Sequence, residues 1–285
     1  MFICKIENTK NNVLTLTQNE SKFQLIKIIG LDPPEAQINT SKMVGLPGSK
    51  FNSANLNDRE IVLTIKLRGD VEKNRLTLYS FFRPGELCKF YYKNDNRDVY
   101  IEGYTKKPDC DLFTNKEIMQ IAILCPNPYF KAIDEIINDI SKTLAGFSFP
   151  FSIGSEGMEF SSINNEKITN VYNNSETETG IIIEITMLNN INKIQLNSII
   201  TGEVFILEYE FVENDKIIID TNKGNKSINL IRNAIKTNLF TAMSNNSIFF
   251  QLEPGDNFFS YLIDEGLNDD NVHILFKHRT LYGGV

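Results

Sequence analysis

Residues 60–68 read EIVLTIKLR, and this stretch decides the kind of structure that the first half of the chain forms. Four apolar residues, Ile61, Leu63, Ile65 and Leu67, recur with a period of two among largely polar neighbours. Successive side chains of a β-strand point to opposite faces of its sheet. The pattern therefore predicts a strand with one buried face.

The residues that follow this strand predict a short helix, a hairpin and a further strand. Asp70 can cap a helix that runs through Phe82, because its carboxylate can accept a hydrogen bond from the first helical turn. Residues 86–92 and 97–104 are β-prone and are joined by a loop rich in Asn and Asp, which is typical of a hairpin. Another β-prone run covers residues 116–125.

The second half of the chain carries almost only strand signals. Short β-prone runs follow one another at regular spacing and are separated by loops of Asn, Asp, Gly and Pro. The runs are residues 168–172, 180–188, 203–212, 216–220, 226–231, 247–252, 258–263 and 272–277. About eight such strands are typical of an antiparallel β-sandwich.

A length of 285 residues fits two domains of about 130 residues each. We expect an N-terminal domain over residues 1–130, a linker over 131–149 and a C-terminal domain over 150–285, whose first strand is predicted at 146–151. Apolar residues of the linker follow helical spacing, which predicts an amphipathic helix over residues 131–145. These residues are Ile133, Ile136, Ile137, Ile140 and Leu144. Their stripe either packs on its own chain or binds a partner.

Composition and charge argue against several classes of protein. The formal net charge of −7 repels polyanions, so no specific nucleic-acid binding is expected; an acidic wall would instead let DNA slide past without sticking. No run approaches the roughly 18 apolar residues of a membrane span, and no signal peptide is recognised, so we expect synthesis in a bacterial cytoplasm without membrane insertion. The four cysteines, Cys4, Cys88, Cys110 and Cys125, stand too far apart to predict a zinc site or a disulfide framework.

The sequence contains no motif that predicts a catalytic, cofactor-binding or metal-binding residue. The chain has two histidines, His273 and His278, and their spacing does not place both on one face of a strand. The acidic residues 264–271 depart from the spacing of a calcium loop, so they form either a solvated turn or an adventitious cation site. Carboxylate pairs for glycoside hydrolysis are assembled in space and stay open. Without Trp, a sugar platform would need Tyr or Phe.

A succession of motifs resembles the distal tail protein family of long-tailed phages. Over about residues 1–130 the matching segments are residues 30–40, 45–48, 59–67, 82–85, 100–104 and 122–130. In the second half they are residues 173–175, 179–183, 217–221, 253–257 and 282–285. Each segment alone is short, and their order carries the resemblance.

The resemblance implies a mainly β protein with an N-terminal β-barrel-like (split-barrel) domain, a short helix and a C-terminal galectin-like antiparallel sandwich. It implies a non-enzymatic virion protein: a homohexameric ring at the distal tip of the tail that joins the tail tube to the tail-tip hub or tail-associated lysin, with tape-measure protein near the lumen. No cofactor is implied. The stretch around Pro33, Pro34 and Pro47 would be an extended arm or belt for neighbouring subunits, or an ordinary loop.

Other functions remain open from the sequence. A carbohydrate-binding module for host-envelope recognition fits a sandwich, although the His-Asn-Pro-Arg type of strand with which galectins hold sugar is not found. A peptidoglycan hydrolase, or a baseplate component of a contractile tail or phage-tail-like bacteriocin, is also compatible with the sequence.

Overall fold

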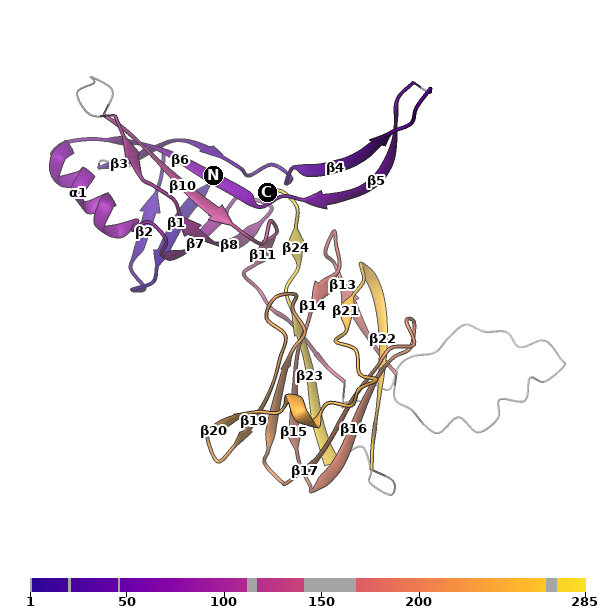
Figure 1. Ribbon diagram of the computed structural model, residues 1–285. Helices are drawn as coiled ribbons and strands as arrows, with labels where there is room; N and C mark the ends of the chain where they lie inside the picture. Colours follow the sequence, from indigo (N-terminus) through magenta and orange to yellow (C-terminus); the bar gives the residue numbers. More distant parts are fainter. Residues whose placement is uncertain (1, 20–21, 46, 112–116, 141–167, 265–270) are drawn as a thin grey trace. The chain divides into compact units, whose positions relative to one another are not determined.

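The computed structural model describes residues 2–19, 22–45, 47–111, 117–140, 168–264 and 271–285. These residues belong to two compact units (Figure 1). Met1–Ile133 and Leu281–Val285 form unit 1, and Asp134–Thr280 form unit 2. The last five residues of the chain thus belong to the first unit, which corrects the prediction of a C-terminal domain over residues 150–285.

Unit 1 is built on one curved antiparallel sheet with the strand order β2-β1-β7-β8-β10-β6-β3. Its strands are β1 (Ile3–Asn8), β2 (Val13–Leu16), β3 (Phe23–Ile29), β6 (Arg59–Leu67), β7 (Leu87–Lys93), β8 (Asp98–Thr105) and β10 (Ile118–Cys125). Three short strands extend it: β9 (Asp109–Cys110), β11 (Phe130–Ala132) and β24 (Leu281–Tyr282). The predicted strands and hairpin of residues 60–68, 86–104 and 116–125 are confirmed by β6, β7, β8 and β10.

The two outer strands of this sheet meet, so that the sheet closes into a barrel-like layer. The Leu25 amide at the start of β3 donates a hydrogen bond of 3.0 Å to the Thr17 carbonyl just after β2. The enclosed core is apolar and includes Ile61, Leu63 and Ile65 of β6, which are fully buried. The period of two in residues 60–68 therefore marks the buried face as predicted.

The helix of unit 1, α1 (Val71–Phe81), also begins as predicted. The Asp70 carboxylate accepts a hydrogen bond of 3.2 Å from the Lys73 amide, which satisfies one of the free N–H groups of the first turn. Leu78 and the following Phe82 are buried against the sheet. This is the only α-helix in the described part of the chain, and no helix there is long and apolar enough to span a membrane.

A separate two-stranded ribbon, β4 (Ala36–Lys42) and β5 (Ser49–Leu56), is inserted between β3 and β6. Figure 1 shows it extending away from the barrel strands of its own unit. Gly45 and Gly48 in its turn have positive φ values of 80° and 90°, which favour glycine. The proline-rich segment of the sequence is therefore an extended hairpin.

Unit 2 is a β-sandwich. One sheet has the order β12-β23-β15-β18-β19-β20 and the other β13-β22-β16-β17. The first comprises β12 (Ile136–Asp139), β15 (Ile182–Met187), β18 (Lys216–Asp220), β19 (Ser227–Arg232), β20 (Ile235–Asn238) and β23 (Val272–His278). The second comprises β13 (Thr169–Asn173), β16 (Ile191–Ser198), β17 (Val204–Phe211) and β22 (Gly255–Ile263). Two short strands, β14 (Thr179–Gly180) and β21 (Gln251–Leu252), pair with each other, and η1 (Phe240–Ala242) is a 3-10 turn.

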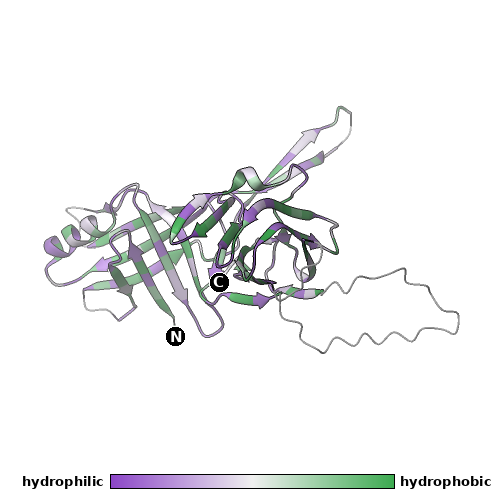
Figure 2. Ribbon diagram, turned by 90° about the horizontal axis from the view of Figure 1, so that it is seen from below, coloured by the Kyte–Doolittle hydropathy of each residue, from purple (hydrophilic) through white to green (hydrophobic). Residues whose placement is uncertain are grey.

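The core of unit 2 lies between the two sheets. Ile183 and Ile185 of one sheet and Phe205 and Leu207 of the other are buried in one cluster. Buried and partly exposed residues alternate along β15 and β18. Figure 2 shows hydrophobic and hydrophilic segments on the strands of the molecule. The predicted antiparallel sandwich is confirmed, and its galectin-like subtype stays a prediction.

The predicted helix over residues 131–145 is wrong for the residues that the structure describes. β11 and β12 occupy this region, and β12 pairs with β23 through Ile136 opposite His278. The Ile140 amide extends the pairing with a hydrogen bond of 2.9 Å to the Ile274 carbonyl. Isoleucine fits a pleated sheet well, and the free edge of β23 supplies hydrogen bonds that the local pattern cannot reveal.

Three predictions fall wholly or partly outside the described residues. These are the remainder of the linker over 141–149, the strand over 146–151 and the acidic turn over 264–271, of which Asp264 and Asn271 are described. The Asp264 carboxylate accepts a hydrogen bond of 2.6 Å from the Asn192 amide. The predicted strand over residues 247–252 shrinks to β21. The strands before β6 and the strands β9, β11, β12, β16, β20 and β24 were not predicted.

Candidate assembly surfaces

The hairpin of β4 and β5 has one apolar face. Ala36 pairs with Leu56, and Ile38 pairs with Ala54. Directly paired residues of an antiparallel ladder lie on the same face. These four side chains, together with Phe51 nearer the turn, therefore form one surface, which we call the apolar hairpin face.

Phe51 joins this face because of a β-bulge. The ladder pairs Asn39 with Ser53 and then Thr40 with Phe51, so Asn52 is an extra residue in β5. A bulge of this kind changes the alternation of one strand relative to its partner. Thr40 is two residues from Ile38 and shares its face, so its partner Phe51 does too.

The opposite face of the hairpin is polar and internally bonded. The Asn39 amide group donates to the Ser53 hydroxyl at 3.1 Å. The Ser41 hydroxyl donates to the Asn52 side-chain carbonyl at 3.2 Å. One face of the hairpin is thus apolar and the other polar, as in a sheet that is covered on one face and exposed to solvent on the other.

In the isolated chain the apolar hairpin face is uncovered. Ile38 is 62% exposed, Phe51 61% and Leu56 44%. Met43 and Val44 at the turn are exposed as well. A two-stranded hairpin is at best marginally stable by itself in water, and grouped exposed apolar side chains mark contact surfaces. The face is therefore suited to packing against another protein surface.

A second candidate surface is an apolar groove beside β3, at the edge of the barrel sheet. The groove encloses about 300 Å³ and is lined by Phe2, Gln18, Leu25, Ile26, Lys27, Ile28, Leu31 and Tyr92. Phe2 and Tyr92 stack at a centroid distance of 6.3 Å. Ile26 is 48% exposed and lies where a register shift interrupts the pairing of β3 with β6. The groove therefore offers apolar area beside an irregular edge.

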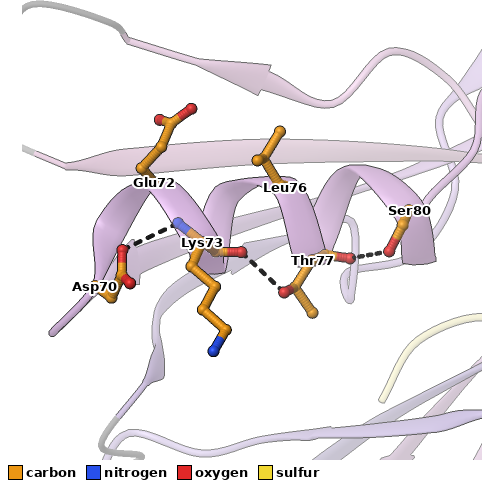
Figure 3. Close-up of a pocket in the computed structure, with 6 residues that line it drawn as sticks. All are labelled: Asp70, Glu72, Lys73, Leu76, Thr77 and Ser80. Atoms are coloured by element: carbon orange, nitrogen blue, oxygen red, sulfur yellow. Dashed lines mark hydrogen bonds between the residues drawn. The ribbon is translucent and has the colours of Figure 1, made fainter.

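A larger hollow of about 520 Å³ lies along α1 and is lined by Asp70, Glu72, Lys73, Leu76, Thr77 and Ser80 (Figure 3). Its polar groups serve the helix itself. Asp70 caps the first turn, the Thr77 hydroxyl donates to the Lys73 carbonyl, and the Ser80 hydroxyl donates to the Thr77 carbonyl, both at 2.8 Å. These groups stabilise a helix, and they are not arranged as a nucleophile with its base.

The histidines lie on opposite faces of β23, as the sequence predicted. His273 faces the outside of the sheet, and its Nε2 lies 3.0 Å from a carboxylate oxygen of Asp139. His278 is buried with the core residues of the same strand, and burial lowers its pKa. In the residues that the structure describes, no group of three or more His, Cys, Asp or Glu side chains is arranged to hold a metal ion.

The cysteines are free thiols. Burial raises the pKa of Cys4 and of Cys125 to about 12 and that of Cys88 to about 11. Cys110 is half-buried, and burial raises its pKa as well. A thiol is nucleophilic only as the thiolate. The three buried thiols stay protonated, so they serve as core residues.

The family model that matches this chain covers a segment of unit 2. Residues 174–279 match the family model of the siphovirus-type tail component, C-terminal domain. No curated protein matches the chain at a significant level. The predicted resemblance is thereby confirmed for the second half.

Likeness to solved structures extends over both units. The Dit protein of phage SPP1, named as a hub adsorption apparatus in Gram-positive infecting phages, matches with a TM-score of 0.70 at 11% identity over 97% of this chain and 98% of its own. A chain of the phage P2 baseplate in its activated conformation with Ca matches with a TM-score of 0.54 at 13% identity over the full length of both. At such identities the likeness establishes the fold, and the fold includes unit 1.

Proposed function

We propose that this chain is a structural subunit of a phage tail, located at the distal end of the tail where tube and tip meet. The observation that carries the proposal is the extent of the fold match. The likeness to the SPP1 hub protein covers 97% of this chain, so it includes the barrel, hairpin and sandwich together. The family model of a siphovirus-type tail component supports the same role from the sequence of unit 2.

Within this role, the hairpin is the contact between copies. The apolar hairpin face of one copy packs on the groove beside β3 of the next copy, since both are apolar and uncovered in the isolated chain. Such a contact joins two different surfaces of the same protein, and repeating it around an axis closes a ring. Six copies are the number that the family resemblance implies.

The subunit acts by holding other proteins and not by catalysis. Tail tube protein would bind one side of the ring, and the tail-tip hub or lysin the other, with tape-measure protein in or near the lumen. The polar groups of the α1 hollow and the buried thiols are engaged in structural contacts, which supports a role without an active site or cofactor. Cell-wall turnover assays on the purified chain should show no activity.

Native mass spectrometry and negative-stain imaging of the purified chain test the ring. We expect a closed oligomer at high protein concentration, alone or with tail partners added. The double variant Ile38→Asp with Phe51→Asp places two charges on the apolar hairpin face and should yield monomers, because each charge would have to be desolvated in the contact.

The matched control is Asn39→Asp with Ser53→Asp, which adds the same charge to the polar face of the same hairpin. This control should assemble like the wild type. A wild-type chain that stays strictly monomeric at high concentration and with partners present would reject the ring. Equal assembly of the two double variants would reject the hairpin as its contact.

A further inference from the structure

Arg59, the first residue of β6, is buried at 3% exposure, and its guanidinium donates to four backbone carbonyls. Its Nε donates to the Pro128 carbonyl at 2.6 Å. One Nη donates to the carbonyls of Gly30 at 2.5 Å and Asp32 at 2.6 Å, and the other donates to that of Gly283. A planar guanidinium with five N–H donors can satisfy such a divergent set, whereas an ammonium group cannot reproduce its geometry.

The four carbonyls come from three segments that are distant in the sequence. Gly30 and Asp32 belong to the turn that leads into β4 of the hairpin. Pro128 precedes β11, the last strand of unit 1 before the chain passes into unit 2. Gly283 lies in the C-terminal tail, Leu281–Val285, which belongs to unit 1. Arg59 thus ties the base of the hairpin to the tail.

The tail has further contacts with unit 1. Tyr282 pairs with Phe130 in the ladder of β24 and β11. The Arg97 guanidinium lies 4.3 Å from the centroid of the Tyr282 ring and donates to the Gly284 carbonyl. The tail is therefore held by a strand ladder and by a second arginine, in addition to Arg59.

The tail also touches the hairpin base directly. The Val285 amide donates to the Leu31 carbonyl at 3.0 Å. Gly284 lies so close to Pro33 that a Cβ at position 284 would come within 3.0 Å of the Pro33 Cδ. The segment that leads into β4 therefore packs against the tail at successive residues.

We propose that Arg59 and the C-terminal tail form a clasp that fixes the base of the β4–β5 hairpin and so sets the direction in which the hairpin leaves the barrel. Arg59 is a positioning residue in this arrangement. The consequence for assembly rests on the proposed function, because it requires the hairpin to be the contact between copies. The last five residues of the chain then control ring formation without belonging to the contact itself.

Hydrogen–deuterium exchange on the isolated full-length chain tests the clasp. Arg97→Ala removes the stacking on Tyr282 and the bond to Gly284, and Gly284→Leu forces the tail away from Pro33; neither changes a residue of the barrel core. Both variants should exchange about tenfold faster than the wild type at the Asn57 amide, which donates to the Glu35 carbonyl at 2.9 Å and so reports on the hairpin base. Arg59→Lys should have the same effect if it folds.

Arg279→Ala is the matched control, because Arg279 stands just before the tail and pairs instead with Glu135 at 3.6 Å in unit 2. It should leave exchange at the Asn57 amide unchanged. Faster exchange confined to residues 281–285 in Arg97→Ala and Gly284→Leu would overturn the clasp. The exchange measurement does not require a ring. A wild-type chain that stays monomeric would therefore reject the proposed function, and the exchange rates would still decide whether the clasp exists. If variants with faster exchange at the hairpin base still assembled fully, the inference that the tail controls ring formation would be overturned.

Discussion

Phe51 and Leu56 lie on the same face of the β4–β5 hairpin although they stand five positions apart in β5, an odd spacing that places side chains on opposite faces of a regular strand. The extra residue, Asn52, accounts for the difference. The bulge thereby places the apolar side chains of both strands on one surface. This surface is uncovered in the isolated chain.

This exposure predicts that polar substitutions on the apolar hairpin face leave the isolated chain nearly as stable as before. Ile38→Ser or Phe51→Ser should change the free energy of unfolding by about 0.5 kcal/mol or less, because these side chains gain little burial on folding. Chemical denaturation of the monomer measures this. For comparison, Leu63→Ala, which truncates a fully buried side chain, should cost about 2–5 kcal/mol. A loss above about 1.5 kcal/mol in Phe51→Ser would mean that its own chain covers the face.

Gly30 is predicted to tolerate no side chain. Its φ is +94°, and a Cβ would come to 2.1 Å from the Glu60 carbonyl oxygen. Gly30→Ala should therefore lower the stability of unit 1 by about 2 kcal/mol or more, through backbone strain and a forced shift of β6. Gly85→Ala is the control, since Gly85 has a φ of +81° with nothing within 4 Å of the added Cβ. It should cost only the strain, about 1 kcal/mol. Equal losses in denaturant titrations would contradict the close approach.

Thiol labelling should distinguish Cys110 from the other cysteines. At pH 8 the folded chain should react fastest at Cys110, because this thiol is only half-buried while Cys4, Cys88 and Cys125 stay protonated and buried. The raised pKa of Cys110 should make this phase slower than the labelling of a free cysteine. Denaturant should release the remaining three of the four thiols counted in the sequence. Cys110→Ser should abolish the rapid phase, and rapid labelling that persists in this variant would place a reactive thiol inside the core.

Unit 2 should lose stability as the pH falls below about 6.5. Burial lowers the pKa of His278 from its ordinary value of 6.5, so the unfolded chain binds the proton more readily than the folded one. The stability that neutral His278 allows is complete above pH 6.5 and declines as the pH falls toward its folded pKa. Urea titrations between about pH 5 and 7.5, followed by a probe in unit 2, measure the slope.

His278→Phe should flatten this dependence between about pH 5 and 7, because it removes the titrating group from the core. His273→Gln, which replaces the histidine on the outer face of the same strand, should retain it. A slope that survives in His278→Phe would contradict its assignment to His278.

Strict alternation predicted the clearest regular strand of the chain. Residues 60–68 show a clean period of two, and β6 has that buried face and pairs without a shift with β10. Two strands that were not predicted carry the extra residue of a register shift, Ile26 in β3 and Asn52 in β5. A bulge adds a residue and breaks the period, so a pattern search passes over such strands.

The local features of this protein follow from its sequence: the strands with unbroken alternation, the Asp70 helix cap, the hairpin of β7 and β8, the sandwich in unit 2 and the separation of the two histidines. Each depends on neighbours within a few residues, whose geometry the chain encodes directly. The tertiary structure was needed to show that residues 136–139 form a strand, that Phe51 joins the apolar hairpin face and that Arg59 binds the C-terminal tail. These depend on backbone partners up to 224 residues away, and no local pattern specifies which distant carbonyl or strand edge completes a hydrogen bond.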